Sequence, residues 1–172
     1  MQEPFGGERF KYSRLLVLCN RVVTVAVAAT LLVAACATAM KPTTPEIAAR
    51  QELMRSNKAA LIELGKITSG EAPWNAAAAQ RFATTITNNA ARIPDLAGKG
   101  TGPEGGRTRA RPAIWSDFDS FERAAWNVED RSRGILALAL AGDEAGVRAR
   151  VTQLEKECDA CHQRFMFPEF PR

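Results

Sequence analysis

Apolar residues recur at helical spacing along most of the chain, and this pattern restricts the fold more than any other feature of the sequence. Ile47, Met54 and Leu61 follow one another at intervals of seven residues. This spacing places the three side chains along one face of an α-helix. The chain contains no convincing run of alternating apolar and polar residues, which is the pattern expected of a half-buried strand. The sequence therefore predicts an all-α protein.

Start and stop signals divide this pattern into four helices. Thr43 and Glu46 have the spacing of a capping box, and Pro45 is tolerated in the first turn of a helix. Gly70 marks the end of the first predicted helix, and Gly142 marks the end of the third. The predicted N-terminal caps of the four helices are, in chain order, Thr43, Asn75, Ser116 and Asp143.

Each predicted helix carries one apolar face. A long connection rich in glycine and arginine, residues 98–111, separates the second helix from the third, and the other two connections are short. Short connections make neighbouring helices antiparallel, so the expected architecture is an antiparallel four-helix bundle. The apolar faces comprise Ile47, Leu53, Met54, Leu61, Leu64 and Ile67, then Phe82, Ile86, Ile93 and Leu96, then Phe118, Phe121, Ala125, Val128 and Ile135, then Val147, Val151, Leu154, Cys158 and Cys161.

The first forty residues have the composition of an export leader. A basic segment is followed by an apolar run of about 14 residues from Val22, which is too short to span a bilayer comfortably. The A-x-A pattern at 37–39 predicts cleavage before Met40, whereas 33–36 resembles a bacterial lipobox that would place a lipid on Cys36. An uncleaved anchor is the third alternative. All three place the rest of the chain outside the cytoplasm. We expect a signal peptide or lipoprotein leader over 1–39, a bundle over 40–172 and a periplasmic location, either soluble or lipid-anchored.

The charge balance argues against nucleic-acid binding. The chain has 23 basic and 19 acidic residues, a formal charge of +4. Four of the basic and two of the acidic residues lie in the first 35, so the remainder carries a surplus of about +2. A surplus that small and scattered does not form a basic patch for a phosphate backbone.

The pentapeptide Cys158-Asp159-Ala160-Cys161-His162 carries the chemistry of the chain. It is C-x-x-C-H, the attachment signature of c-type haem. Two thiols three positions apart share one face of a helix and can reach both vinyl groups of one porphyrin. His162 is the only histidine in the chain. The signature predicts thioether bonds from Cys158 and Cys161 and makes His162 the proximal iron ligand.

Other interpretations of the same cysteines fit less well. A structural zinc site needs four ligands, and once Cys36 is assigned to the leader only three are available here. A thioredoxin-like C-x-x-C belongs to a βαβ context, which this chain lacks. A disulfide between Cys158 and Cys161 would be strained in a regular helix. Two core cysteines by chance would leave the adjoining histidine unexplained.

Several further segments, in the right order, resemble the cytochrome c′ family of haem proteins. Residues 50–54 are similar to the family's first-helix motif, and 70–75 to the turn that follows it. Residues 102–106 and 111–116 resemble the long connection into the third helix. The resemblance covers the chain from Pro45 to Phe165. It implies a four-helix bundle, the architecture typical of this family, with one covalently attached haem c.

The resemblance places Met54 at the position that meets the distal face of the haem. Some family members carry a bulky aliphatic residue there, keep a five-coordinate iron and bind NO or CO. Others have a methionine that ligates the iron and are low-spin electron carriers, and Met54 is more like these. Met54 also occupies a core position, where methionine commonly fills gaps, so simple packing stays open.

The sequence also supports expectations for several residues other than Met54. Arg50 resembles a family arginine near the haem propionates, with a solvated surface arginine as the alternative. Phe165 resembles an aromatic residue beside the proximal ligand. The family often has a basic residue four positions after the histidine, where this chain has Met166. The arginines of the long connection are expected to be solvated or to steer an acidic redox partner, and all three tryptophans to pack. They are Arg107, Arg109 and Arg111, and Trp74, Trp115 and Trp126.

The predicted function is that of an exported monohaem c-type cytochrome. It would carry single electrons between periplasmic or membrane redox partners, and the alternative is NO or CO binding at a five-coordinate iron. An enzymatic role is not expected, because the only histidine is assigned to the proximal side and no distal base is left. Bundles of this kind commonly pair through their first two helices, so a homodimer is compatible with the sequence.

Overall fold

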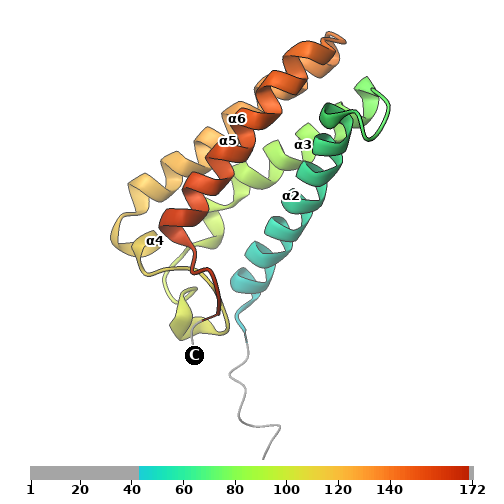
Figure 1. Ribbon diagram of the computed structural model, residues 1–172. Helices are drawn as coiled ribbons and strands as arrows, with labels where there is room; N and C mark the ends of the chain where they lie inside the picture. The colour runs from blue at the N-terminus through green and yellow to red at the C-terminus, as the bar shows by residue number, and fades with distance from the viewer. Residues whose placement is uncertain (1–42, 171–172) are drawn as a thin grey trace, which may run out of the picture. The chain divides into compact units, whose positions relative to one another are not determined.

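The computed structural model describes residues 43–170 as a bundle of four long helices (Figure 1). The leader predicted over 1–39 lies outside the described residues. The long helices are α2 (Pro45–Ser69), α3 (Ala76–Arg92), α5 (Phe118–Leu140) and α6 (Glu144–Phe165). Three short helical segments, η1 (Pro94–Leu96), η2 (Pro103–Gly105) and α4 (Ala113–Ser116), lie in the connection between α3 and α5. The predicted all-α, four-helix architecture is confirmed.

Local capping explains most helix ends. The side chain of Asn75 accepts a hydrogen bond from Ala78 N at 2.9 Å, and that of Asp143 accepts one from Gly146 N at 2.8 Å, as predicted. The N-cap of α2 is Thr44, whose hydroxyl accepts from Ile47 N, so the capping box predicted from Thr43 is wrong by one residue.

The third helix begins differently from the prediction. Ser116 is not its cap, because Ser116 closes the four-residue helix α4, and α5 begins after Asp117. Phe118, predicted to belong to the apolar face, is 37% exposed. The second helix also ends earlier than its apolar pattern suggests. Pro94 has no N–H to continue the helix, so Leu96 lies in the separate 3-10 turn η1.

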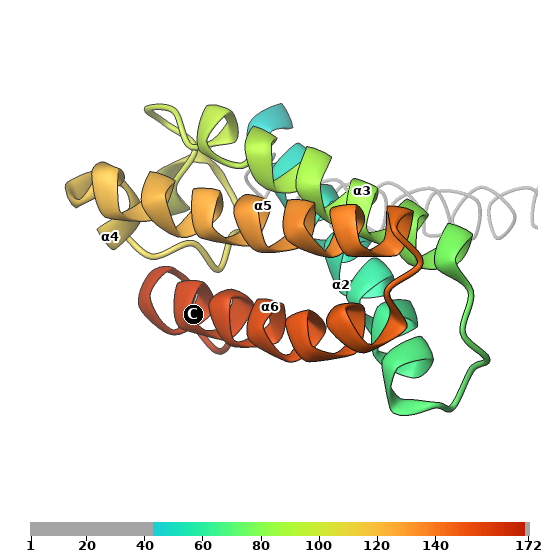
Figure 2. The same ribbon diagram turned by 90° about the horizontal axis from the view of Figure 1, so that it is seen from above.

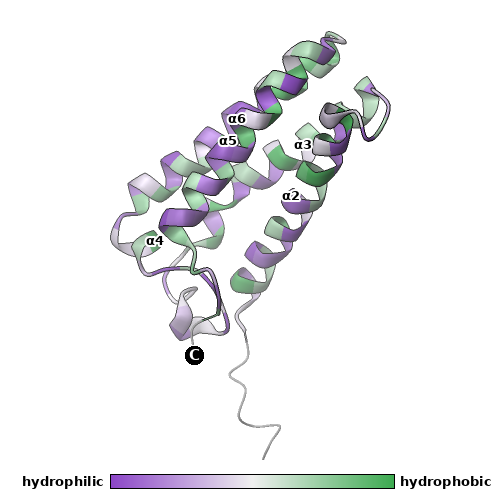
Figure 3. Cartoon of the chain, viewed as in Figure 1, coloured by the Kyte–Doolittle hydropathy of each residue, from purple (hydrophilic) through white to green (hydrophobic). Residues whose placement is uncertain are grey.

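The core lies where the apolar faces of the four helices meet. Figure 3 shows apolar and polar residues alternating along each helix, as expected for helices with one buried face. Leu53 and Leu64 from α2, Ile86 from α3 and Ile135 from α5 are among the buried residues. Met54 and Leu61 are only partly buried and pack at the edge of this core. This places them on the flank of α2 and not on its most buried face.

The long connection closes one end of the bundle. Thr44 N, at the start of α2, donates to Gly105 O at 3.1 Å. Further along the connection, Ala110 forms an isolated antiparallel bridge with Met166, just beyond α6. The segment predicted as a loop is therefore held on both sides by the bundle.

Over the described residues, no helix is long and apolar enough to cross a membrane.

Candidate cofactor-attachment site

The last two turns of α6 place the pentapeptide against the core. Cys158 and Cys161 are both free thiols, partly buried and packed against the core cluster. His162 is half-buried on the same side of the helix, because positions 158, 161, 162 and 165 share one face. Phe165, one turn further on, is buried and packs edge-to-face on Phe121 with ring centroids 5.3 Å apart. Its predicted place near His162 agrees with this arrangement.

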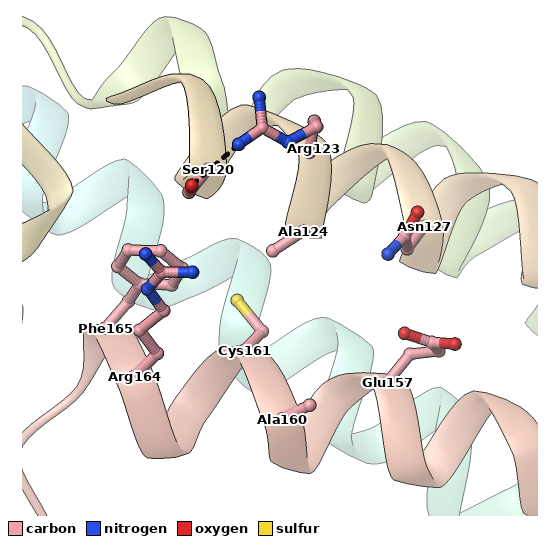
Figure 4. Close-up of a pocket in the computed structure, with 9 residues that line it drawn as sticks. All are labelled: Ser120, Arg123, Ala124, Asn127, Glu157, Ala160, Cys161, Arg164 and Phe165. Carbon is pink, nitrogen blue, oxygen red and sulfur yellow. Dashed lines mark hydrogen bonds between the residues drawn. The ribbon is translucent and has the colours of Figure 1, made fainter. Parts of the chain in front are cut away.

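A cavity of about 320 Å³ opens between α5 and α6 beside Cys161. Figure 4 shows the sulfur of Cys161 directed toward Ala124 across this space. Ala124 and Ala160 are small, which leaves room next to the thiol. The other lining residues are Ser120, Arg123, Asn127, Glu157, Arg164 and Phe165.

Burial favours the neutral forms of Cys158, Cys161 and His162. It raises the pKa of Cys158 to about 11, with further contributions from the charges of Cys161 and nearby acidic residues, and raises the pKa of Cys161 to about 11. Burial also lowers the pKa of His162, opposed by Asp159 and supported by Arg109. A neutral imidazole is the form that binds iron. Unreacted thiols are protonated at neutral pH, which makes them poor nucleophiles before attachment.

The register of α2 against α6 brings Met54 level with His162. Arg148 Nη1 on α6 donates to Thr68 O on α2, which fixes the two antiparallel helices at that point. Met54 lies fourteen residues before Thr68, and His162 lies fourteen residues after Arg148. At 1.5 Å per residue both are about 21 Å along their helices from the contact. Met54 and Thr68 differ by two heptads, so they occupy the same flank of α2.

The two helices also separate toward this level. Figure 2 shows α2 and α6 closest where α2 ends and α6 begins, and diverging toward their other ends. Met54 and His162 both lie in the diverging part.

Arg50 is neither solvated nor free. Only 6% of its surface is exposed. Its Nη1 donates to Leu96 O at 2.6 Å and its Nη2 donates to Thr101 O at 2.8 Å. Its guanidinium also lies 5.9 Å from the Trp115 ring. The alternative of a surface arginine is therefore wrong, and Arg50 ties α2 to the long connection.

Comparison with known proteins decides which family this architecture represents. A family model described as Cytochrome C′ matches residues 45–166. The chain belongs to the cytochrome c′ family. A cytochrome c-556 from Agrobacterium tumefaciens (strain II Chrys) is 35% identical over 122 residues, which cover 70% of this chain and 95% of that protein.

Solved cytochromes c′ have the same fold. The crystal structure of the Rubrivivax gelatinosus protein superposes with a TM-score of 0.66 at 26% identity, covering 71% of this chain and 94% of that one. A nitric oxide complex of a leucine-to-alanine variant of the Alcaligenes xylosoxidans protein gives a TM-score of 0.65 at 28% identity, covering 72% and 94%.

Membership of the cytochrome c′ family means one covalent c-type haem, with the C-x-x-C-H motif near the C-terminus. The residues present fit this group. Both thiols are unbridged, that of Cys161 lies beside a cavity, and burial favours the neutral form of the neighbouring imidazole. In the part of the chain described, no three His, Cys, Asp or Glu side chains gather to hold a bare metal ion. Cytochrome c′ proteins are generally non-enzymatic and typically periplasmic.

Sequence reasoning missed the role of the arginines in the long connection. Arg107 is exposed, as expected, whereas Arg109 and Arg111 are half-buried. Each of the three contacts the C-terminal tail after α6: Arg107 and Arg111 contact aromatic rings, and Arg109 a carbonyl. Their spacing of two residues, which would place the side chains on one side of an extended segment, was the available signal. The expectation that all tryptophans pack is wrong for Trp126, which is 58% exposed.

Proposed function

We propose that this cytochrome c′ family protein carries single electrons through a six-coordinate haem with His162 and Met54 as axial ligands. The observation that supports the proposal most strongly is the register that brings Met54 level with His162 along the two antiparallel helices. A thioether at that position is an accepted axial ligand for c-type haem.

Each residue has a defined task in this proposal. The haem supplies the one-electron couple of its iron. Cys158 and Cys161 hold the group by thioether bonds, so it is not lost outside the cytoplasm. His162 offers a neutral imidazole, since burial lowers its pKa. Met54 fills the distal position in both oxidation states, which avoids a ligand-exchange step during electron transfer.

Arg50 has a second proposed partner, a haem propionate. Its Nη atoms already donate to the carbonyls of the long connection. A propionate contact would have to be made in addition to these bonds. The contact with the propionate therefore stays a prediction.

Gas binding is the alternative function. The nitric oxide complex of the Alcaligenes xylosoxidans variant shows that a relative of the same fold takes NO. The two functions differ in whether Met54 occupies the iron or leaves it open.

Absorption spectra of the oxidised and reduced holoprotein, with and without CO, test the proposal. We expect the wild type to be low-spin, with a methionine–iron charge-transfer band and no response to CO. Met54→Ala should become high-spin and bind CO, because alanine cannot supply the thioether. Met166→Ala is the matched control, since this methionine follows α6 on the proximal side, and its spectra should match the wild type. A high-spin wild type that responds to CO would overturn electron transfer through Met54 and favour gas binding.

A further inference from the structure

Three alternating arginines of the long connection are fixed to the C-terminal tail. The guanidinium carbon of Arg107 lies 4.1 Å from the centre of the Phe170 ring, and that of Arg111 lies 5.2 Å from the Phe167 ring. Arg109, between them, is held by hydrogen bonds and not by a ring. Its Nε donates to Phe167 O at 2.7 Å.

The backbone of Arg109 is anchored to the same residue. Phe167 N donates to Arg109 O at 2.7 Å, and the adjacent Ala110 bridges to Met166. Arg111 N donates to Phe165 O at 2.9 Å, which continues the pairing. Both the main chain and the guanidinium of Arg109 are therefore fixed, and this half-buried side chain has little freedom to move away from the end of α6.

This pairing places a positive charge beside the proximal ligand. Met166 N donates to His162 O at 3.0 Å, so the segment that holds Arg109 begins on the same turn of α6 as His162. The Arg109 guanidinium donates to Phe167 O, and Phe167 lies five residues beyond His162 along the chain. Arg131, Arg148 and Arg164 each pair with a carboxylate, whereas none of the ion pairs within residues 43–170 involves Arg109. Its charge is not neutralised locally.

We propose that the positive charge of Arg109 raises the reduction potential of the haem from the proximal side. A nearby cation disfavours the additional positive charge of the ferric state, and a partly buried cation is weakly screened by salt. Asp159, within the pentapeptide, acts in the opposite direction. The inference deepens the proposed function and rests on His162 as proximal ligand, but it does not depend on Met54.

Midpoint potentials of holoproteins, measured by spectroelectrochemical titration at pH 7, test this role. Arg109→Gln should lower the midpoint potential, and Arg109→Lys should retain most of the wild-type value because the charge is kept. Arg107→Gln is the matched control. It removes the same charge from the same connection, but Arg107 is exposed and contacts the distant Phe170 ring. Its midpoint should stay near that of the wild type.

Two results would overturn the proposal. One is an equal midpoint for Arg109→Gln and Arg107→Gln. The other is a fall for Arg109→Lys as large as that for Arg109→Gln, since shape and not charge would then be responsible. If Arg109→Gln does not mature, Arg109→Met removes the charge while keeping a long side chain, and a midpoint equal to that of Arg107→Gln would contradict the role. A high-spin wild-type spectrum would overturn ligation by Met54 without changing any of these comparisons.

Discussion

Arg50 is the residue whose contacts in the structure differ most from those expected from the sequence. A buried guanidinium is unfavourable unless its N–H groups find acceptors. Here the acceptors are the carbonyls of Leu96 and Thr101 and the hydroxyls of Thr101 and Thr108, with no carboxylate among them. Burial accordingly lowers the pKa of Arg50. One side chain thus satisfies polar groups from both ends of the connection between α3 and α5.

Replacing Arg50 should therefore cost far more stability than replacing an exposed arginine of the same helix. We expect Arg50→Leu to lower the free energy of unfolding by about 2–4 kcal/mol, because buried carbonyls lose their donors. Arg55→Leu, which removes only an exposed pair with Glu52, should cost about 0–1 kcal/mol. Urea unfolding of the two holoproteins measures both values. Equal losses would show that the buried contacts of Arg50 contribute nothing to stability.

The elements of this fold differ in how far their own sequence determines them. Asn75 and Asp143 were predicted as caps because a cap is set by the three residues that follow it. The start of α5 was not predicted correctly, because the four-residue helix α4 ends at Ser116 and α5 begins only after Asp117. The two-residue spacing of Arg107, Arg109 and Arg111 indicated an extended segment, but nothing in the sequence indicated that its partner is the tail after α6. The pentapeptide was predictable because its chemistry lies within five consecutive residues.

The long connection itself should be sensitive to small changes of volume. A Cβ at Gly105 would lie 2.1 Å from Gly100 O and 3.2 Å from Ile47 Cδ1, so a side chain there forces the backbone apart. We expect Gly105→Ala to cost about 1–3 kcal/mol by overpacking. Gly98→Ala, in the same connection, meets nothing within 4 Å and should be close to neutral. Thermal unfolding of the two variants makes the comparison, and a stable Gly105→Ala protein would show that the close approach is not required.

At the scale of the whole molecule, one end of the bundle carries almost everything specific to this protein. The start of α2, the long connection and the tail after α6 are joined there through Thr44, Gly105, Arg109 and Phe167. The other end contains only the short turns that follow Gly70 and Gly142, both in the left-handed conformation. Stability and cofactor attachment are therefore coupled at a single end.

The proposed leader, residues 1–39, predicts the mass of the mature protein. Cleavage before Met40 would give a chain that begins at Met40, whereas processing at the lipobox would give one that begins at a lipid-modified Cys36. Intact-mass spectrometry of the haem protein purified from a host that exports and lipidates distinguishes these products. A full-length chain that retains residues 1–35 would contradict both forms of cleavage.

The position of Thr43 determines how far from the bundle a lipid on Cys36 could lie. Thr43 leaves the bundle at the end that holds Cys161 and His162. A lipid on Cys36 would be only seven residues away, a reach of at most about 25 Å. The tether would then keep the start of α2 within that distance of the lipid anchor. Electron partners embedded in the membrane would be within reach of such an anchored molecule, whereas a form cleaved before Met40 would diffuse to soluble partners.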